Sequence, residues 1–183
     1  MIEERRGRLL ELVRACVSQG AVTLASGKTS DFYVDGRLVT LTGEGSVLIG
    51  EAILERARAL GATAIAGPTT GACPMVTAAG VLAHQGGESF KLTYVRSAPK
   101  AHGMQKSVEG PALSREDRVL MVEDVVTSGG SVLRAVERLQ ADTGARVLAV
   151  LCVVDRQAGG AEAFAQSGVP LEALFTKADV QGA

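Results

Sequence analysis

One stretch of the sequence joins two adjacent carboxylates to a turn of glycine and hydroxyl residues. An apolar run that predicts a buried strand precedes Glu123 and Asp124, and the turn at residues 127–131 leads into apolar residues at helical spacing. We expect Ser131 to be the N-cap of that helix, because its hydroxyl can accept a hydrogen bond from the first turn. The turn would then offer unpaired backbone N–H groups and the positive end of the helix dipole, which both favour a phosphate.

The two carboxylates must serve another part of the same ligand. Glu123 and Asp124 would repel a phosphate, whereas the cis-diol of a ribose offers hydroxyl donors to them. Gly129 and Gly130 would let the backbone approach the anion closely. A phosphorylated ribose therefore accounts for both halves of the motif. An ordinary strand–turn–helix unit is the alternative, and the acid pair directly before the turn favours the functional interpretation.

Composition excludes several classes of protein. The 183 residues suit one domain over residues 1–183, with 46% hydrophobic and 21% charged residues. A net charge of −1 and only 3% aromatic residues argue against nucleic-acid binding, and the charge also argues against an anionic membrane surface. Cys16, Cys73 and Cys152 match no zinc site or redox pair. Without a signal-peptide pattern or a long apolar run, we expect a cytoplasmic protein.

Strand and helix patterns alternate along most of the chain. Helices are expected at residues 2–19, 44–60, from 74, from 131 to 141, and at 159–167; strands are expected at 62–66, 90–95, 118–123, 146–154 and 171–175. This order predicts an α/β fold with a parallel sheet flanked by helices. Ligands bind such sheets at the carboxyl ends of the strands. Residues 96–117 are too long for a plain connection and are a candidate functional loop.

The strand, acid pair and Thr/Ser/Gly turn resemble the phosphoribosyl-diphosphate (PRPP) motif of type I phosphoribosyltransferases. The resemblance implies that fold, and it implies a catalytic role for Asp124. The PRPP-binding residues that it implies within this motif are Glu123, Asp124, Val125, Val126, Thr127, Ser128, Gly129, Gly130 and Ser131.

A second segment, residues 24–37, is similar to the Ser-Gly-x-x-Ser-x-x-Tyr-x-Asp-x-Arg signature of orotate phosphoribosyltransferases. The matching residues are Ser26, Gly27, Ser30, Tyr33, Asp35 and Arg37. The resemblance implies that residues 20–42 form a small N-terminal hood over the base and that Lys28 and Tyr33 bind orotate. From the residues alone, a polar hairpin that covers a sheet edge would also fit.

A third segment, residues 94–103, resembles the mobile catalytic loop Arg-x3-Lys-x-His-Gly of the same family. Arg96, Lys100 and His102 match, so the resemblance implies that they bind PRPP and that Lys100 and His102 are catalytic. Cations on a closing lid stabilise the charge of departing diphosphate and exclude water. A solvated loop with scattered charges is the alternative. The family also implies a homodimer that shares lid residues across its interface.

Arg156 follows an apolar strand and Asp155. An arginine there can pair with a carboxylate through two hydrogen bonds, and orotate has a carboxylate. The resemblance implies that Arg156 and Thr127 bind orotate, while a structural salt bridge stays open as the role of Arg156.

The chain departs from part of the family in its cations. Ala25, Ser97 and the lysine-free loop at residues 69–72 stand where some members carry basic residues. The implied reaction converts orotate and PRPP into orotidine 5′-monophosphate and diphosphate, for UMP synthesis. Mg²⁺ is the implied cofactor, held mainly by the substrates. A PRPP-sensing regulator and a phosphoribosyltransferase for another base are the alternatives.

Overall fold

A six-stranded sheet forms the centre of the protein, with the strand order β5-β4-β3-β6-β7-β8. The computed structural model describes residues 3–18, 22–23, 29–30, 32–97 and 107–182. The strands of this sheet are β3 (Ala64–Pro68), β4 (Lys91–Val95), β5 (Val108–Glu109), β6 (Arg118–Val126), β7 (Arg146–Asp155) and β8 (Leu171–Thr176). All neighbouring pairs are parallel except β4 and β5. The predicted parallel sheet is therefore confirmed, with an antiparallel strand at one edge.

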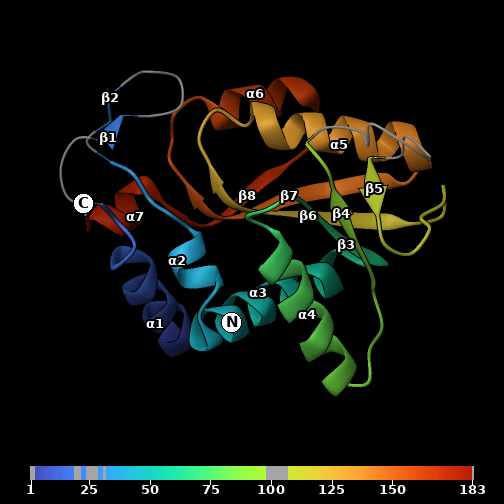
Figure 1. The fold of residues 1–183 in the computed structure, drawn as a ribbon, viewed down its shortest axis with the longest axis horizontal. Coiled ribbons are helices and arrows are strands. Elements are labelled where there is room, and N and C mark those ends of the chain that lie inside the picture. The colour runs from blue at the N-terminus through green and yellow to red at the C-terminus, as the bar shows by residue number, and fades with distance from the viewer. Residues whose placement is uncertain (1–2, 19–21, 24–28, 31, 98–106, 183) are drawn as a thin grey trace.

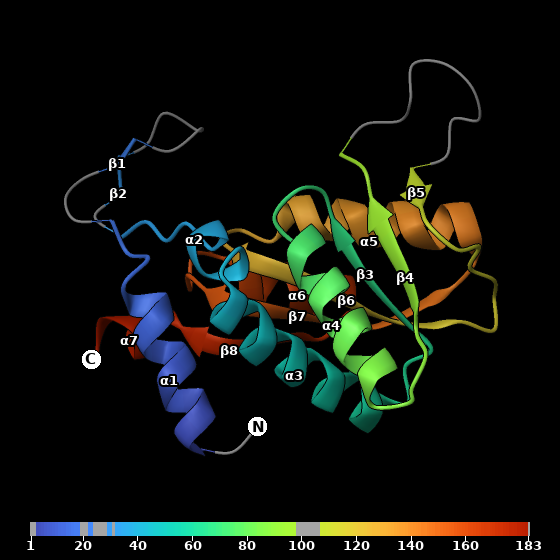
Figure 2. The ribbon, with the colours of Figure 1, turned by 60° about the horizontal axis from the view of Figure 1, so that its bottom comes forward.

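Helices cover both faces of the sheet (Figures 1 and 2). One face packs against α3 (Gly43–Leu60) and α4 (Cys73–Gln85), with α1 (Glu3–Arg14) beside α3. The other face packs against α5 (Gly130–Thr143) and α6 (Gly160–Ser167). Side chains of β6 alternate between the two cores, as the two-residue period of a strand requires. No helix within the described part of the chain is long and apolar enough to cross a membrane.

The segment expected as the hood lies outside the main sheet. Its described parts include β1 (Val22–Thr23) and β2 (Thr29–Ser30), which pair with each other in antiparallel fashion, and α2 (Arg37–Thr40). A bridge between Val17 and Val34 connects this segment to the end of α1. Strands β1 and β2 thus form a two-stranded sheet separate from the six-stranded one.

Several expected boundaries were wrong. The first helix ends at Arg14, so the buried Cys16 lies in a turn and not in a helix. Strand β5 was missed because it has only two residues and no measurable alternation. Helix α7 (Lys177–Gln181) was also missed, although Thr176 and Asp179 form a capping box at its start.

The expected N-cap of α5 was wrong as well. The helix begins at Gly130, and its N-cap is Gly129 in the left-handed conformation, with φ of 77°. A Cβ on Gly129 would lie 2.9 Å from the Phe164 ring of α6. Both the backbone angle and this contact favour glycine, so the chain turns into the helix before it reaches Ser131.

Candidate active site

The candidate site lies between the neighbouring strands β3 and β6, from which the chain continues in opposite directions across the sheet. From β3 the chain continues to β4 on one side, and from β6 it continues to β7 on the other side. In open α/β sheets such a point leaves a crevice at the carboxyl ends of the two strands. The loop after β3 and the acid pair near the end of β6 meet at this crevice.

Asp124 reaches the crevice between two glycines that come from distant parts of the sequence. A Cβ on Gly71 would lie 2.8 Å from Oδ1 of Asp124, and a Cβ on Gly36 would lie 2.8 Å from Oδ2. Oδ1 also accepts a hydrogen bond of 2.8 Å from the backbone N–H of Val125. The carboxylate is half-buried, so a ligand can contact it. Sequence analysis did not identify either glycine, because nothing local shows that they flank an acid.

A second charge lies close to Asp124. Arg37 forms an ion pair of 2.9 Å with Asp35. Asp35 is the main cause of the raised pKa of Arg37, and Asp124 adds to it. The same pair lowers the pKa of Asp35. The hood residue Arg37 therefore lies within electrostatic reach of Asp124.

Glu123 has a different environment from its neighbour. Its residue exposure is 8%, and it pairs in register with Cys152 of β7. Burial, followed by the charge of Asp124, raises the pKa of Glu123 to about 9. Its Oε1 accepts a hydrogen bond of 3.2 Å from the N–H of Asp124. Burial is the main cause of the raised pKa of Cys152.

The phosphate loop connects β6 to the N-terminus of α5. Val125 and Val126 are the last part of β6, and Thr127 and Ser128 precede the left-handed Gly129. The N-cap has no side-chain hydrogen bond, so the first N–H groups of α5 keep the capacity to bind an anion.

Arg156 joins this loop to the hood. Its Nη1 donates to Oγ1 of Thr127 at 3.3 Å, and its Nη2 donates to the carbonyl oxygen of Phe32. Its guanidinium also lies over the Phe32 ring, 6.0 Å from the centroid. The structure thus brings Arg156 and Thr127 together, as expected, and it places Tyr33 next to the residue that Arg156 contacts.

The lid is described only at its ends. Arg96 follows β4 and forms an ion pair of 3.5 Å with Glu109. Lys100 and His102 lie outside the described residues, and so does Lys28 of the hood.

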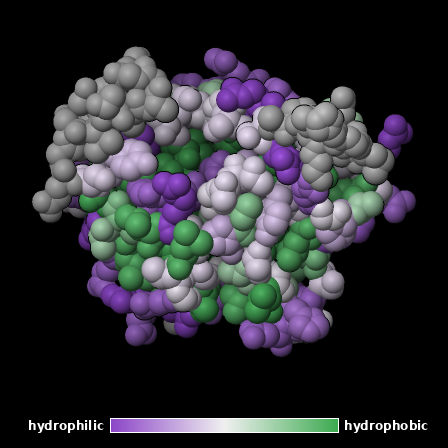
Figure 3. Space-filling model, viewed as in Figure 1, coloured by the Kyte–Doolittle hydropathy of each residue, from purple (hydrophilic) through white to green (hydrophobic). Residues whose placement is uncertain are grey.

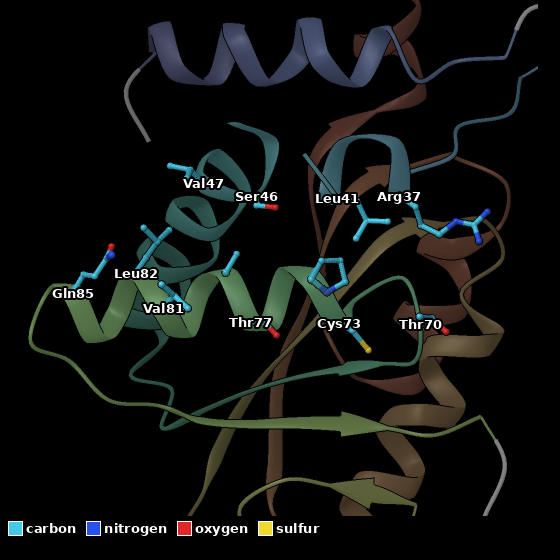
Figure 4. A pocket seen from close by; sticks show the side chains of 12 residues that line it. Arg37, Leu41, Ser46, Val47, Thr70, Cys73, Thr77, Val81, Leu82 and Gln85 are labelled. Carbon is cyan, nitrogen blue, oxygen red and sulfur yellow. The ribbon is translucent and has the colours of Figure 1, made fainter. Parts of the chain in front are cut away.

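A groove of about 690 Å³ extends from the crevice along α4. Figure 4 shows Arg37 and Thr70 at one end and Gln85 at the other, with Leu41 and Val47 facing α4. Its lining is mainly apolar, so it differs in character from the acid pair and the phosphate loop.

Comparison with known proteins agrees with this arrangement. The family model for the phosphoribosyl transferase domain matches residues 47–165. The orotate phosphoribosyltransferase of Thermosynechococcus vestitus is 43% identical over 177 residues, which covers 97% of this chain and 93% of the relative. That of Rhodopirellula baltica is 45% identical, with 89% of this chain and 86% of the relative covered.

Solved structures give the same result. The orotate phosphoribosyltransferase of Mycobacterium tuberculosis in complex with PRPP matches with a TM-score of 0.78 and 36% identity, over 97% of this chain and 99% of that one. Adenine phosphoribosyltransferase of Leishmania donovani, at 16% identity and a TM-score of 0.67 over 93% of this chain and 80% of that one, shares the fold alone. The fold, the phosphate loop and these relatives together place the chain in the orotate phosphoribosyltransferase family.

Proposed function

We propose that this protein transfers the 5-phosphoribosyl group of PRPP to orotate, giving orotidine 5′-monophosphate and diphosphate in pyrimidine biosynthesis. The observation that carries the proposal is the acid pair of β6 followed by the phosphate loop of α5, at the crevice between β3 and β6. The chain that carries this arrangement is similar over nearly its full length to orotate phosphoribosyltransferases. The fold alone would not select orotate, since the adenine enzyme shares it.

The phosphate loop binds the 5′-phosphate. The N–H groups at the start of α5 donate to its oxygens, and Gly129 and Gly130 leave room for its approach. Thr127 and Ser128 add hydroxyl donors. The backbone of Val125 and Val126 places the loop at the carboxyl end of β6.

The two acids bind the ribose in different ways. Asp124 is open to the crevice and accepts from a ribose hydroxyl, and its charge stabilises the positive ring as the C1–O bond to diphosphate breaks. Glu123 retains its proton near neutral pH because its pKa is raised, so it donates to a hydroxyl oxygen. A new bond then forms between C1 and N1 of orotate, and the N1 proton, which is acidic, leaves without a dedicated protein base.

Cations of the lid stabilise the departing diphosphate. Arg96 lies at the end of β4, and Lys100 and His102 follow it in the sequence. Their positive charges offset the negative charge that the leaving group gains as the bond breaks. The family resemblance supports the roles of Lys100 and His102.

Arg156, Thr127, Lys28 and Tyr33 orient the orotate. Arg156 supports this assignment by its position beside Thr127 and the hood. An amide or hydroxyl in its place could not offer two charged donors to the orotate carboxylate.

Mg²⁺ is the proposed cofactor. The described residues hold no cluster of three or more His, Cys, Asp or Glu side chains that could bind a metal. The half-open carboxylate of Asp124 fits an ion that keeps its water and binds mainly to substrate oxygens. Mg²⁺ bound there would supply charge neutralisation of the diphosphate.

We further propose a homodimer with shared lids in the cytoplasm. The large hydrophobic side chains that the structure describes as exposed are Leu38, Leu41, Val47 and Val81, at 60%, 69%, 40% and 53%. Leu41, Val47 and Val81 line the apolar groove beside the crevice. Figure 3 shows hydrophobic surface over α2 and α4. Contiguous apolar surface of this kind marks interaction sites, and a second copy there would lie next to the active site.

Loss of orotate absorbance with PRPP and Mg²⁺ tests the activity, in parallel with hypoxanthine, adenine, xanthine and uracil. We expect turnover with orotate alone. Turnover of another base without orotate turnover would assign a different substrate. Tight PRPP binding without any turnover would indicate the regulatory alternative.

A further inference from the structure

Helix α5 contacts both ends of the segment that carries Lys100 and His102. The first turn of α5 belongs to the phosphate loop, and later turns carry Arg138 and Asp142. These two residues are four apart, so they lie on the same face of the helix. One contacts the chain just before residues 98–106, and the other contacts it just after.

The chain that enters the segment is bound by Arg138. Its Nη1 donates to the carbonyl oxygen of Arg96 at 3.0 Å and also to the carbonyl oxygen of Ser97. Arg138 is half-buried in this position. A hydrogen bond from a charged donor is stronger than one between neutral groups, so this contact fixes the backbone where β4 ends.

The chain that leaves the segment is bound by Asp142. Its Oδ2 accepts a hydrogen bond of 2.8 Å from the backbone N–H of Ser107, a residue that is only 5% exposed. The carbonyl oxygen of Ser107 accepts from the N–H of Arg96 at 2.8 Å, which joins the two ends to each other. A side-chain carboxylate thus satisfies a buried N–H that would be costly to leave unpaired.

The strands alone give these ends little support. Strand β5 has two residues, pairs only with β4, and lies at the sheet edge. The contacts with α5 therefore supply the rigidity that this short pair of strands lacks.

We propose that Arg138 and Asp142 are positioning residues that hold both ends of residues 98–106 on the phosphate-binding helix. The inference rests on the proposed function, in which Lys100 and His102 approach the diphosphate. Through these contacts, the helix that would bind the 5′-phosphate also holds Arg96, Ser97 and Ser107, the described residues on either side of the segment that carries Lys100 and His102. Misplacement of catalytic groups by about 1 Å can cost roughly 10²-fold in rate.

Four variants test the role. In Arg138→Ala and Asp142→Ala, we expect kcat/KM for PRPP to fall about 10–100-fold. The KM for orotate should stay near its wild-type value, and the melting temperature should fall by only a few degrees, because each variant loses buried or half-buried hydrogen bonds to the backbone. Arg138→Lys retains a charged donor and Asp142→Asn retains an acceptor oxygen, so each should recover part of the loss. Arg146→Ala and Glu137→Ala are matched controls: Arg146 is exposed at the opposite end of the sheet, and Glu137 is exposed on α5.

Amide hydrogen exchange at Ser107 gives a measurement that does not depend on activity. Exchange should be faster in Asp142→Ala than in wild type and unchanged in Glu137→Ala. If the wild-type enzyme converts orotate, and Arg138→Ala and Asp142→Ala have the same kcat/KM for PRPP as their controls, the positioning role is overturned. A wild-type enzyme that fails to convert orotate would instead overturn the proposed function, and the positioning role with it.

Discussion

Gly71 leaves space for the carboxylate of Asp124, so we expect Gly71→Ala to lower kcat without a comparable loss of unfolding free energy. A Cβ at residue 71 would lie 2.8 Å from Oδ1 and 2.9 Å from Oδ2 of Asp124. Ordinary contact requires about 3.5 Å, so the carboxylate in Gly71→Ala must retreat by roughly 0.6–0.7 Å. The atoms that must move are at the end of the flexible Asp124 side chain, and Gly71 does not have a positive φ. The fold can therefore accommodate the extra methyl group.

The displaced carboxylate should affect the chemical step. A shift of this size predicts a fall in kcat of about 10–100-fold, equivalent to about 1.4–2.7 kcal/mol of activation free energy. The free energy of unfolding should change by less than about 1 kcal/mol. The orotate absorbance assay at saturating substrates measures kcat, and urea unfolding of the same preparation measures stability.

Two other glycines serve as controls. Gly7 of α1 has nothing within 4 Å of its Cβ position, so Gly7→Ala should keep wild-type kcat and gain about 0.5–1 kcal/mol in stability. Gly36→Ala would place a Cβ 2.7 Å from the Cβ of Asp124, which is fixed to the strand, so both activity and stability should fall. Wild-type kcat in Gly71→Ala would refute the importance of the carboxylate position. A loss of kcat matched by an equal loss of unfolding free energy would indicate general packing damage.

Further predictions concern single charges and the dimer. Asp124→Asn should lower kcat by about 10²–10³-fold with the fold intact. Glu123→Gln should have a smaller effect, because the raised pKa of Glu123 favours its neutral form, which glutamine resembles; equal losses in steady-state kinetics would contradict this reasoning. The pKa of Asp117 is lowered to about 2, chiefly by Lys91, so its stabilising contribution is complete above the unfolded pKa of about 4 and is lost as the pH falls toward 2. Asp117→Asn should therefore cost about 1–3 kcal/mol at pH 7 and much less near pH 2 by urea unfolding; a cost independent of pH would rule out the ionic contribution. Mixing Lys100→Ala with Asp124→Ala subunits should restore roughly one quarter of wild-type activity, since half the dimers are mixed and each has one intact site; no activity in purified mixed dimers would exclude a shared lid.

The parts of the site that sequence analysis could predict are contiguous in the chain. Residues 123–131 form one strand end, one turn and one helix start, so local pattern was sufficient to locate them. The cap of α5 was misplaced because the left-handed Gly129 is determined partly by Phe164, which packs on it from another helix. Local hydroxyl preference favoured Ser131, and tertiary packing overrode it.

Contacts between distant segments could not be predicted in this way. Gly36 and Gly71 flank Asp124 only because the hood and the loop after β3 meet at the end of β6. Arg138 and Asp142 have the spacing of ordinary surface charges on a helix, and their partners are backbone groups that leave no signal in the sequence. Such residues become visible only when the strand order is known.

The acid pair itself illustrates how much a strand encodes. The two adjacent acids of β6 interact with each other but differ in exposure: Glu123 is buried, whereas Asp124 is half-buried. Glu123 pairs in register with buried Cys152, and burial followed by the charge of Asp124 raises its pKa to about 9. Asp124 points toward Gly36 and Gly71 at the crevice and stays accessible. We therefore propose different roles for the two acids at the ribose diol: the accessible Asp124 accepts from a hydroxyl beside the developing positive charge, and the buried Glu123 donates to the other hydroxyl.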